Sequence, residues 1–249
     1  EYWGSLVQQV EYYEDWNEWI TQTCSRSCCC DSKGENCGTE SYDCSYCQYH
    51  LAYWQIVTTT GETVGISRSE YEKLKTKFGN EQFSELNRNY HTDDGDEYYS
   101  IWPRDSARAV PVTTLHHYEN RIKAADQSVF HYQKVKEADV KKFNLKEYPA
   151  LFGYHMQALL GDSSRDALLA DKKLQYINGL LGHKKEVRLF VLVFKNQPVA
   201  AAFYQEWYWS GANMNEFVVC VGIDKERNVK WCKPISWTRS ETLKAEVKS

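Results

Sequence analysis

The segment Val187–Phe194 reads VRLFVLVF, a nearly continuous run of large apolar residues. Such a run predicts a β-strand that is buried on both faces, because a strand with one solvated face would alternate apolar and polar residues. Helical patterns flank it at Ala167–Leu181, before Gly182, and at Val199–Ser210, which follows Pro198 and precedes Gly211. We expect the first helix to bury its apolar face, which carries Ala170, Leu174, Ile177 and Leu181.

Two more strand-like runs follow, Phe217–Ile223 (FVVCVGI) and Val229–Trp237 (VKWCKPISW), and the polar segment 224–228 between them predicts a hairpin. The order helix, strand, helix, strand, strand indicates a small α/β layer. The handedness rule for crossovers makes segment 187–194 parallel to segment 217–223. Counting outward from a five-residue loop places Cys220 opposite Cys232, close enough for a disulfide. The alternative is a pair of buried free cysteines.

The run Leu174–Trp237 resembles the TPM domain, a small α/β/α module found mostly in extracytoplasmic, membrane-anchored proteins. The matching pieces are VRLFVLVF, the helix AAFYQEWYWSG with its late Trp and Gly, and the strand pair FVVCVGIDKERNVKW. The whole chain is also similar to a set of membrane-anchored bacterial proteins in which a cysteine- and tyrosine-rich region (EYYEDWNEWI, YDCSYCQYH) precedes this module. That resemblance implies membrane helices upstream of residue 1, and a chain that opens at Glu1 without Met agrees with a processed or excised segment.

Some TPM proteins are metal-dependent phosphatases with acidic ligands in the loop after the central helix. Here that loop is Gly211–Glu216, which offers Asn213, Asn215 and Glu216 and lacks the Asp-rich set that such a site needs. The resemblance therefore implies at most a divalent cation at Glu216 together with Asp162 or Asp224. No catalytic motif is found in the chain, so we assign no catalytic residue.

Seven of the nine cysteines lie in one polar segment that has too few apolar residues for its own core: Cys24, Cys28, Cys29, Cys30, Cys37, Cys44 and Cys47. In an oxidising compartment disulfides would cross-link this segment. In a reducing compartment Cys44 and Cys47, with Cys37, Cys24, Cys28 or His50, could bind zinc. Free thiols are the third alternative. We favour disulfides, and because adjacent cysteines bridge only with strain, Cys28, Cys29 and Cys30 should have different partners.

The region 1–150 is expected to be a β-dominated, aromatic- and cysteine-rich part, and 166–249 the TPM-like α/β module, with a boundary between them. Residues 1–22 fit a helix or a strand, and that choice stays open. Within this region we expect a hairpin around Gly61-Glu62 with Gly61 first in the turn, and a helix that begins at the capping box Ser67-x-x-Glu70 and ends at Gly79. A second hairpin is expected around 91–97, a strand at 110–115 and a short helix at 138–143.

The composition excludes two classes of protein. With 30 Lys and Arg against 34 Asp and Glu, the chain has a formal charge of −4 and lacks the basic surface of a nucleic-acid binder. Its apolar runs are far shorter than the ~20 residues of a membrane helix.

Aromatic residues make up 14% of the chain, and Tyr and Trp favour interfaces. Three in succession cannot all face one core, so we expect an interaction surface at Trp207, Tyr208 and Trp209.

These observations favour an extracytoplasmic domain, periplasmic or at the cell surface, that serves binding or assembly rather than catalysis. Its expected partner is another protein or a second copy of the chain, without nucleic acid and without a required cofactor. A TPM-type metal-dependent phosphatase is the first alternative. A structural protein of a cell surface or virion is the second.

Overall fold

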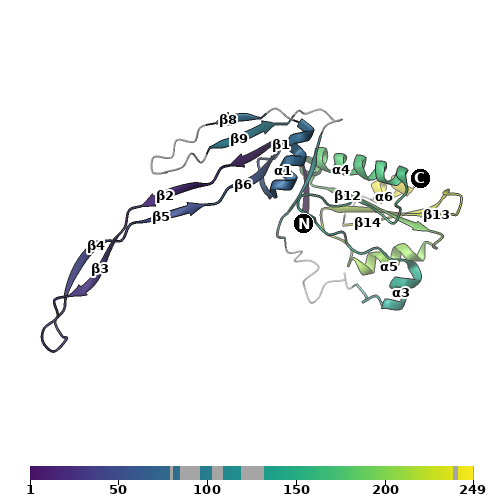
Figure 1. The fold of residues 1–249 in the computed structure, drawn as a ribbon. Coiled ribbons are helices and arrows are strands. Elements are labelled where there is room, and N and C mark those ends of the chain that lie inside the picture. Colours follow the sequence, from purple (N-terminus) through teal and green to yellow (C-terminus); the bar gives the residue numbers. More distant parts are fainter. Residues whose placement is uncertain (79–80, 85–95, 103–108, 119–131, 238–240, 249) are drawn as a thin grey trace. The chain divides into compact units, whose positions relative to one another are not determined.

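The computed structural model describes residues 1–78, 81–84, 96–102, 109–118, 132–237 and 241–248, which form a mixed α+β fold (Figure 1). Unit 1 comprises Glu1–Val7, Thr58–Glu62 and Pro103–Ser249, and unit 2 comprises Gln8–Val57 and Thr63–Trp102. The predicted division into 1–150 and 166–249 differs from this one. The reason is that Phe143 and Leu145 belong to the same buried cluster as Phe190, so the segment before residue 150 packs with the second half of the chain.

The sheet of unit 1 has the strand order β11-β12-β13-β14. Its strands are β11 (Leu159–Leu160), β12 (Arg188–Lys195), β13 (Glu216–Ile223) and β14 (Val229–Ser236). The first three are parallel, which confirms the predicted pairing of 187–194 with 217–223, and β14 is antiparallel to β13. Alternate side chains of β12, those of Phe190, Leu192 and Phe194, are fully buried and form the centre of the core.

Helix α4 (Arg165–Lys185) lies along one face of this sheet, and α5 (Ala200–Tyr208) and the short α3 (Glu137–Phe143) lie on the other (Figure 1). Helix α6 (Glu241–Lys248) packs beside β14. The predicted order of helix, strand, helix, strand, strand is therefore confirmed. Among the residues described, no helix combines the length and the apolar character that crossing a membrane requires.

The prediction for α4 is wrong in two respects. The helix continues through Gly182 to Lys185, where Glu186 adopts a left-handed conformation at the C-cap. The expected apolar face is not the buried one, since Ile177 and Leu181 are 39% and 41% exposed. The buried positions are instead small or polar: Ala167, Asp171, Asn178, Gly179 and Gly182.

Close backbone approach explains which side of α4 is buried. A Cβ atom on Gly179 would lie 2.7 Å from the carbonyl oxygen of Ser5, and one on Gly4 would lie 2.2 Å from the carbonyl oxygen of Asn178. The Asn178 side chain also donates to the Leu189 carbonyl at 2.9 Å and accepts from the Leu189 amide at 2.8 Å. Glycine contacts and amide hydrogen bonds therefore orient the helix more strongly than its leucines do.

A bulge changes the register of the β13–β14 hairpin. Cys220 lies opposite Lys233 and Cys232 lies opposite Val221, with a register shift between Gly222 and Ile223. The predicted opposition of Cys220 and Cys232 is therefore wrong, because a shift of one residue turns the two side chains to opposite faces. Neither cysteine forms a disulfide, and burial raises the pKa of the Cys220 thiol to about 12.

Strand β1 (Tyr2–Tyr13) resolves the open choice for the N-terminal segment in favour of a strand. Its residues 2–6 pair in antiparallel fashion with β10 (Pro111–Leu115) in unit 1. The existence of β10 confirms the strand predicted at 110–115, whose pairing was not predicted. In unit 2 the strand order is β7-β6-β1-β9-β8. The other strands there are β6 (Tyr53–Thr58), β7 (Thr63–Ile66), β8 (Gln82–Ser84) and β9 (Glu97–Ile101).

The predicted β6–β7 hairpin and the helix after it are confirmed, but the turn differs. The Gly61 amide donates to the Thr58 carbonyl and Gly61 has φ 84°, so the glycine ends the turn rather than opening it. Helix α1 (Arg68–Phe78) begins at the predicted capping box, where the Glu70 amide donates to Ser67 Oγ and the Ser67 amide donates to Glu70 Oε2. Gly79 and most of the expected turn at 91–97 lie outside the described residues.

We predict that Asp171→Ala destabilises the chain by about 1–3 kcal/mol, because two backbone amides would lose their buried acceptor. Asp171 is 8% exposed, and its Oδ1 accepts from the amides of Ala158 and Leu159 at 2.9 and 2.8 Å. Chemical denaturation measures the effect. Lys172→Ala, at the exposed neighbouring position, is the control and should change stability by less than about 0.5 kcal/mol. Equal effects of the two substitutions would contradict this role for Asp171.

Candidate functional site

Residues 16–50 of unit 2 form two consecutive two-stranded ladders, here called the cysteine ribbon (Figure 1). Strand β2 (Trp16–Ile20) pairs with β5 (Tyr46–His50), and β3 (Thr23–Cys28) pairs with β4 (Gly38–Asp43). At the tip, Asp31 Oδ1 accepts from the amides of Lys33 and Glu35 and so shapes the turn. Every residue of β4 is exposed, so this end of the ribbon has no core of its own.

Two disulfides cross-link the ribbon. Cys24–Cys44 lies where the two ladders meet, and Cys30–Cys37 closes the loop at the tip. Disulfides of this kind indicate an oxidising environment. The zinc alternative needed Cys44 as a thiolate together with Cys47, and Cys44 is disulfide-bonded, as are the further candidate ligands Cys24 and Cys37. Cys28, Cys29 and Cys47 form no disulfide.

One face of the β2–β5 ladder carries exposed aromatic side chains. Trp19 pairs across the ladder with Cys47, and Tyr49 follows Cys47 by two positions on the same face. Trp19 is 51% exposed and Tyr49 is 53% exposed. Large aromatic side chains at such positions are typical of protein contact surfaces.

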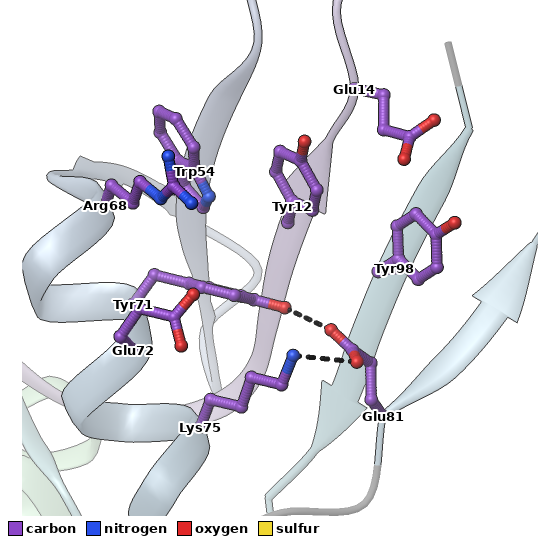
Figure 2. A pocket seen from close by; sticks show the side chains of 9 residues that line it. All are labelled: Tyr12, Glu14, Trp54, Arg68, Tyr71, Glu72, Lys75, Glu81 and Tyr98. Carbon is purple, nitrogen blue, oxygen red and sulfur yellow. Dashed lines mark hydrogen bonds and ion pairs between the residues drawn. The ribbon is translucent and has the colours of Figure 1, made fainter. Parts of the chain in front are cut away.

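The same unit contains a cavity of about 270 Å³ whose wall is aromatic (Figure 2). Tyr12 from β1 lies between Trp54 from β6 and Tyr98 from β9, with ring centroids 5.3 and 5.8 Å away and planes within 7° and 19° of parallel. Tyr71 reaches in from α1, with its ring centroid 6.0 Å from that of Tyr12. We call this site the aromatic cavity.

Charged side chains surround these rings (Figure 2). Glu81 accepts from Tyr71 Oη at 2.9 Å and pairs with Lys75 Nζ at 2.8 Å. These contacts outweigh partial burial and hold the pKa of Glu81 below its ordinary value, while burial and Glu81 raise the pKa of Tyr71. Glu14 lies near Tyr12 and Tyr98, and Arg68 lies beside Trp54 (Figure 2).

The predicted metal ligands Glu216, Asp162 and Asp224 do not form one site. Glu216 begins β13 and Asp224 follows its last residue, so eight residues of extended chain separate them by roughly 25 Å. Glu216 is 1% exposed, and its oxygens accept hydrogen bonds from Tyr148 and from the side chain and backbone amide of Asn213. Burial and Glu216 raise the pKa of Tyr148, so this group is a closed internal network.

The two aspartates are each held by cations of the chain. Asp162 pairs with Lys195 Nζ and Arg227 Nη2, both at 2.8 Å, and Asp224 pairs with Lys230 Nζ at 2.9 Å. Within the described part of the chain, no group of three or more His, Cys, Asp or Glu side chains is arranged to hold a metal ion. The three residues therefore have structural partners within the chain in this arrangement.

The predicted interaction surface at Trp207, Tyr208 and Trp209 is wrong for Trp209. This indole is 8% exposed, packs on Tyr148 and Phe190, and donates to the Lys146 carbonyl at 2.7 Å. Trp207 and Tyr208 are half-buried. The hydroxyl of Tyr208 donates to Glu147, which raises the pKa of Tyr208 to about 12.

No family model, curated protein or solved structure matches this chain. The resemblance to the TPM domain therefore stays a prediction.

Sequence reasoning missed the aromatic cavity. Its rings come from positions 12, 54, 71 and 98, which four different elements bring together. Only Tyr71, on the predicted apolar face of α1, carried a local signal. The other three become neighbours only when β1 pairs with β6 and β9, and no local pattern specifies that pairing.

We predict that Asp162 stabilises the folded chain at neutral pH and that this contribution is lost as the pH falls from about 4 toward 2. Hydrogen bonding to Lys195 and to Ser164 outweighs burial and lowers its pKa from 3.8 to about 2. Because the folded-state pKa lies below the unfolded one, the contribution is complete above pH ~4 and is lost as the pH passes through the folded value.

Asp162→Asn tests this by thermal unfolding at pH 7, 4 and 2.5. The variant should be less stable than the natural chain at pH 7, and the difference between the two should shrink as the pH falls. A difference that stays constant with pH would show that the carboxylate charge is not the source of the effect.

Proposed function

We propose that this chain is an extracytoplasmic binding and assembly module whose cysteine ribbon makes the protein contact. The observation that carries the proposal is a disulfide-linked ribbon that exposes Trp19 and Tyr49 on one face. The disulfides favour the oxidising side of a membrane. Exposed aromatic side chains gathered on one face favour a protein contact surface.

The edges of the outer ladder support contact with another strand. In the described part of the chain, β3 pairs with β4 alone, so this ladder is a sheet of two strands with two open edges. Open edges present backbone donors and acceptors to any extended segment. A second copy of the chain offers the same edge, and two identical edges can pair in antiparallel fashion about a two-fold axis.

We therefore expect the chain to self-associate and the double variant Trp19→Ser, Tyr49→Ser to associate at least tenfold more weakly, because aromatic anchors commonly contribute more than about 1.4 kcal/mol each. Sedimentation velocity over a concentration series measures this under non-reducing conditions. Phe152→Ser is the matched control, since it removes an aromatic side chain of unit 1 that is 76% exposed.

The control should associate like the natural chain. A chain that stays monomeric at every concentration, or a double variant that associates as strongly as the natural chain, would contradict the proposal.

A further inference from the structure

We propose that the aromatic cavity of unit 2 binds the alkylammonium group of a small organic cation, held against the aromatic wall that Tyr12, Trp54 and Tyr98 form and by the carboxylate of Glu14. This ligand site goes beyond the assembly function proposed for the ribbon and uses none of its residues.

The wall of the cavity has the composition that ammonium groups prefer. The face of an aromatic ring attracts a cation through its quadrupole, most strongly for Trp and then for Tyr. Trp54 and three tyrosines line one cavity, and two of the tyrosines belong to the row in which Tyr12 lies between Trp54 and Tyr98 (Figure 2). A volume of about 270 Å³ lies just below the range typical of drug-sized ligands and so suits a small group.

The cavity already contains one ammonium group in this arrangement. Lys75 Nζ lies 5.9 Å from the centroid of the Tyr71 ring and 2.8 Å from Glu81 Oε2. The Lys75 ammonium is thus held by an aromatic ring and a carboxylate together. Figure 2 shows the same two kinds of group, rings and a carboxylate, on the side of the cavity where Tyr12, Tyr98 and Glu14 lie.

On that second side no Lys, Arg or His among the described residues forms an ion pair with Glu14. Glu81 belongs to an ion pair in the described part of the chain, and Glu14 belongs to none there. Glu14 lies near the hydroxyl of Tyr98 and contributes to the raised pKa of that group. The Arg68 side chain lies on the opposite side of Tyr12, beside Trp54 (Figure 2).

The electrostatics at the two tyrosines agree with a cation site. Burial, Glu14 and Asp15 raise the pKa of Tyr12, and Arg68 lowers it by less. Burial, Glu14 and Asp96 raise the pKa of Tyr98. Both rings therefore lie in a negative potential, which favours a positive ligand and disfavours an anionic one.

Titration calorimetry of the full chain with choline, n-butylammonium and 3,3-dimethylbutan-1-ol tests the proposal. The last compound has the shape of choline with carbon in place of the charged nitrogen, so it separates charge from shape. We expect at least one ammonium probe to bind, and the neutral alcohol to bind at least tenfold more weakly than choline if choline is that probe.

Glu14→Gln keeps the size of the side chain and removes its charge, and it should weaken ammonium binding about tenfold. Glu226→Gln, an equal change of charge at an exposed position in unit 1, is the control and should bind like the natural chain. Circular dichroism and melting temperature show whether Glu14→Gln is folded. If it is not, Tyr98→Phe, which keeps the ring and removes its hydroxyl, replaces it and should leave ammonium binding in place.

Each result decides the question. The proposal is overturned if neither ammonium probe binds at 100 mM, if the neutral alcohol binds as tightly as choline, or if a folded Glu14→Gln variant binds unchanged. Glucose binding in place of ammonium binding would assign the cavity to a sugar and overturn it as well. Sedimentation of Glu14→Gln should match that of the natural chain, which distinguishes a failure of this site from a failure of the proposed assembly function.

Discussion

The Cys24–Cys44 bond links the two sides of the cysteine ribbon at the point where its two ladders meet, and the shape of that ribbon depends on it. A two-stranded hairpin without a second layer is at best marginally stable in water. Here the β3–β4 ladder is exposed along nearly its whole length. A cross-link that closes a loop of this length stabilises a chain by about 3 kcal/mol in the entropic account. The ribbon is therefore ordered by covalent bonds, and an oxidising environment is a condition of its structure.

Unit 1 is held together in a different way. Its sheet has an apolar centre on β12, yet its helix α4 is positioned by polar groups. Asp171 accepts from two backbone amides, and Asn178 bonds to Leu189 from both ends of its amide. Polar groups of this kind cost free energy when they are buried without partners, and the hydrogen bonds that they form when paired are directional. They fix one orientation of the helix and leave several of its leucines at the surface.

The sequence was informative where a local pattern has a local cause. The continuous apolar run at 187–194 predicted the buried parallel strand, and Ser67 with Glu70 predicted the start of α1. The α4 face was wrong because Gly4 and Gly179 permit a backbone approach that apolar periodicity does not encode. The predicted opposition of Cys220 and Cys232 was wrong because a bulge between Gly222 and Ile223 shifts the β13–β14 register by one residue, which turns the two side chains to opposite faces of the sheet. The Cys24–Cys44 pairing and the aromatic cavity depend on strand pairings between residues far apart in the sequence, so no spacing rule could give them.

The most direct test of this account is disulfide mapping of the non-reduced, alkylated chain by peptide mass spectrometry. The structure predicts two cross-linked pairs, Cys24–Cys44 and Cys30–Cys37, and alkylation of the other five cysteines after denaturation. Nine alkylated cysteines in chain isolated under non-reducing conditions would contradict it. That result would remove both the covalent basis of the ribbon and the reason to place the chain in an oxidising compartment.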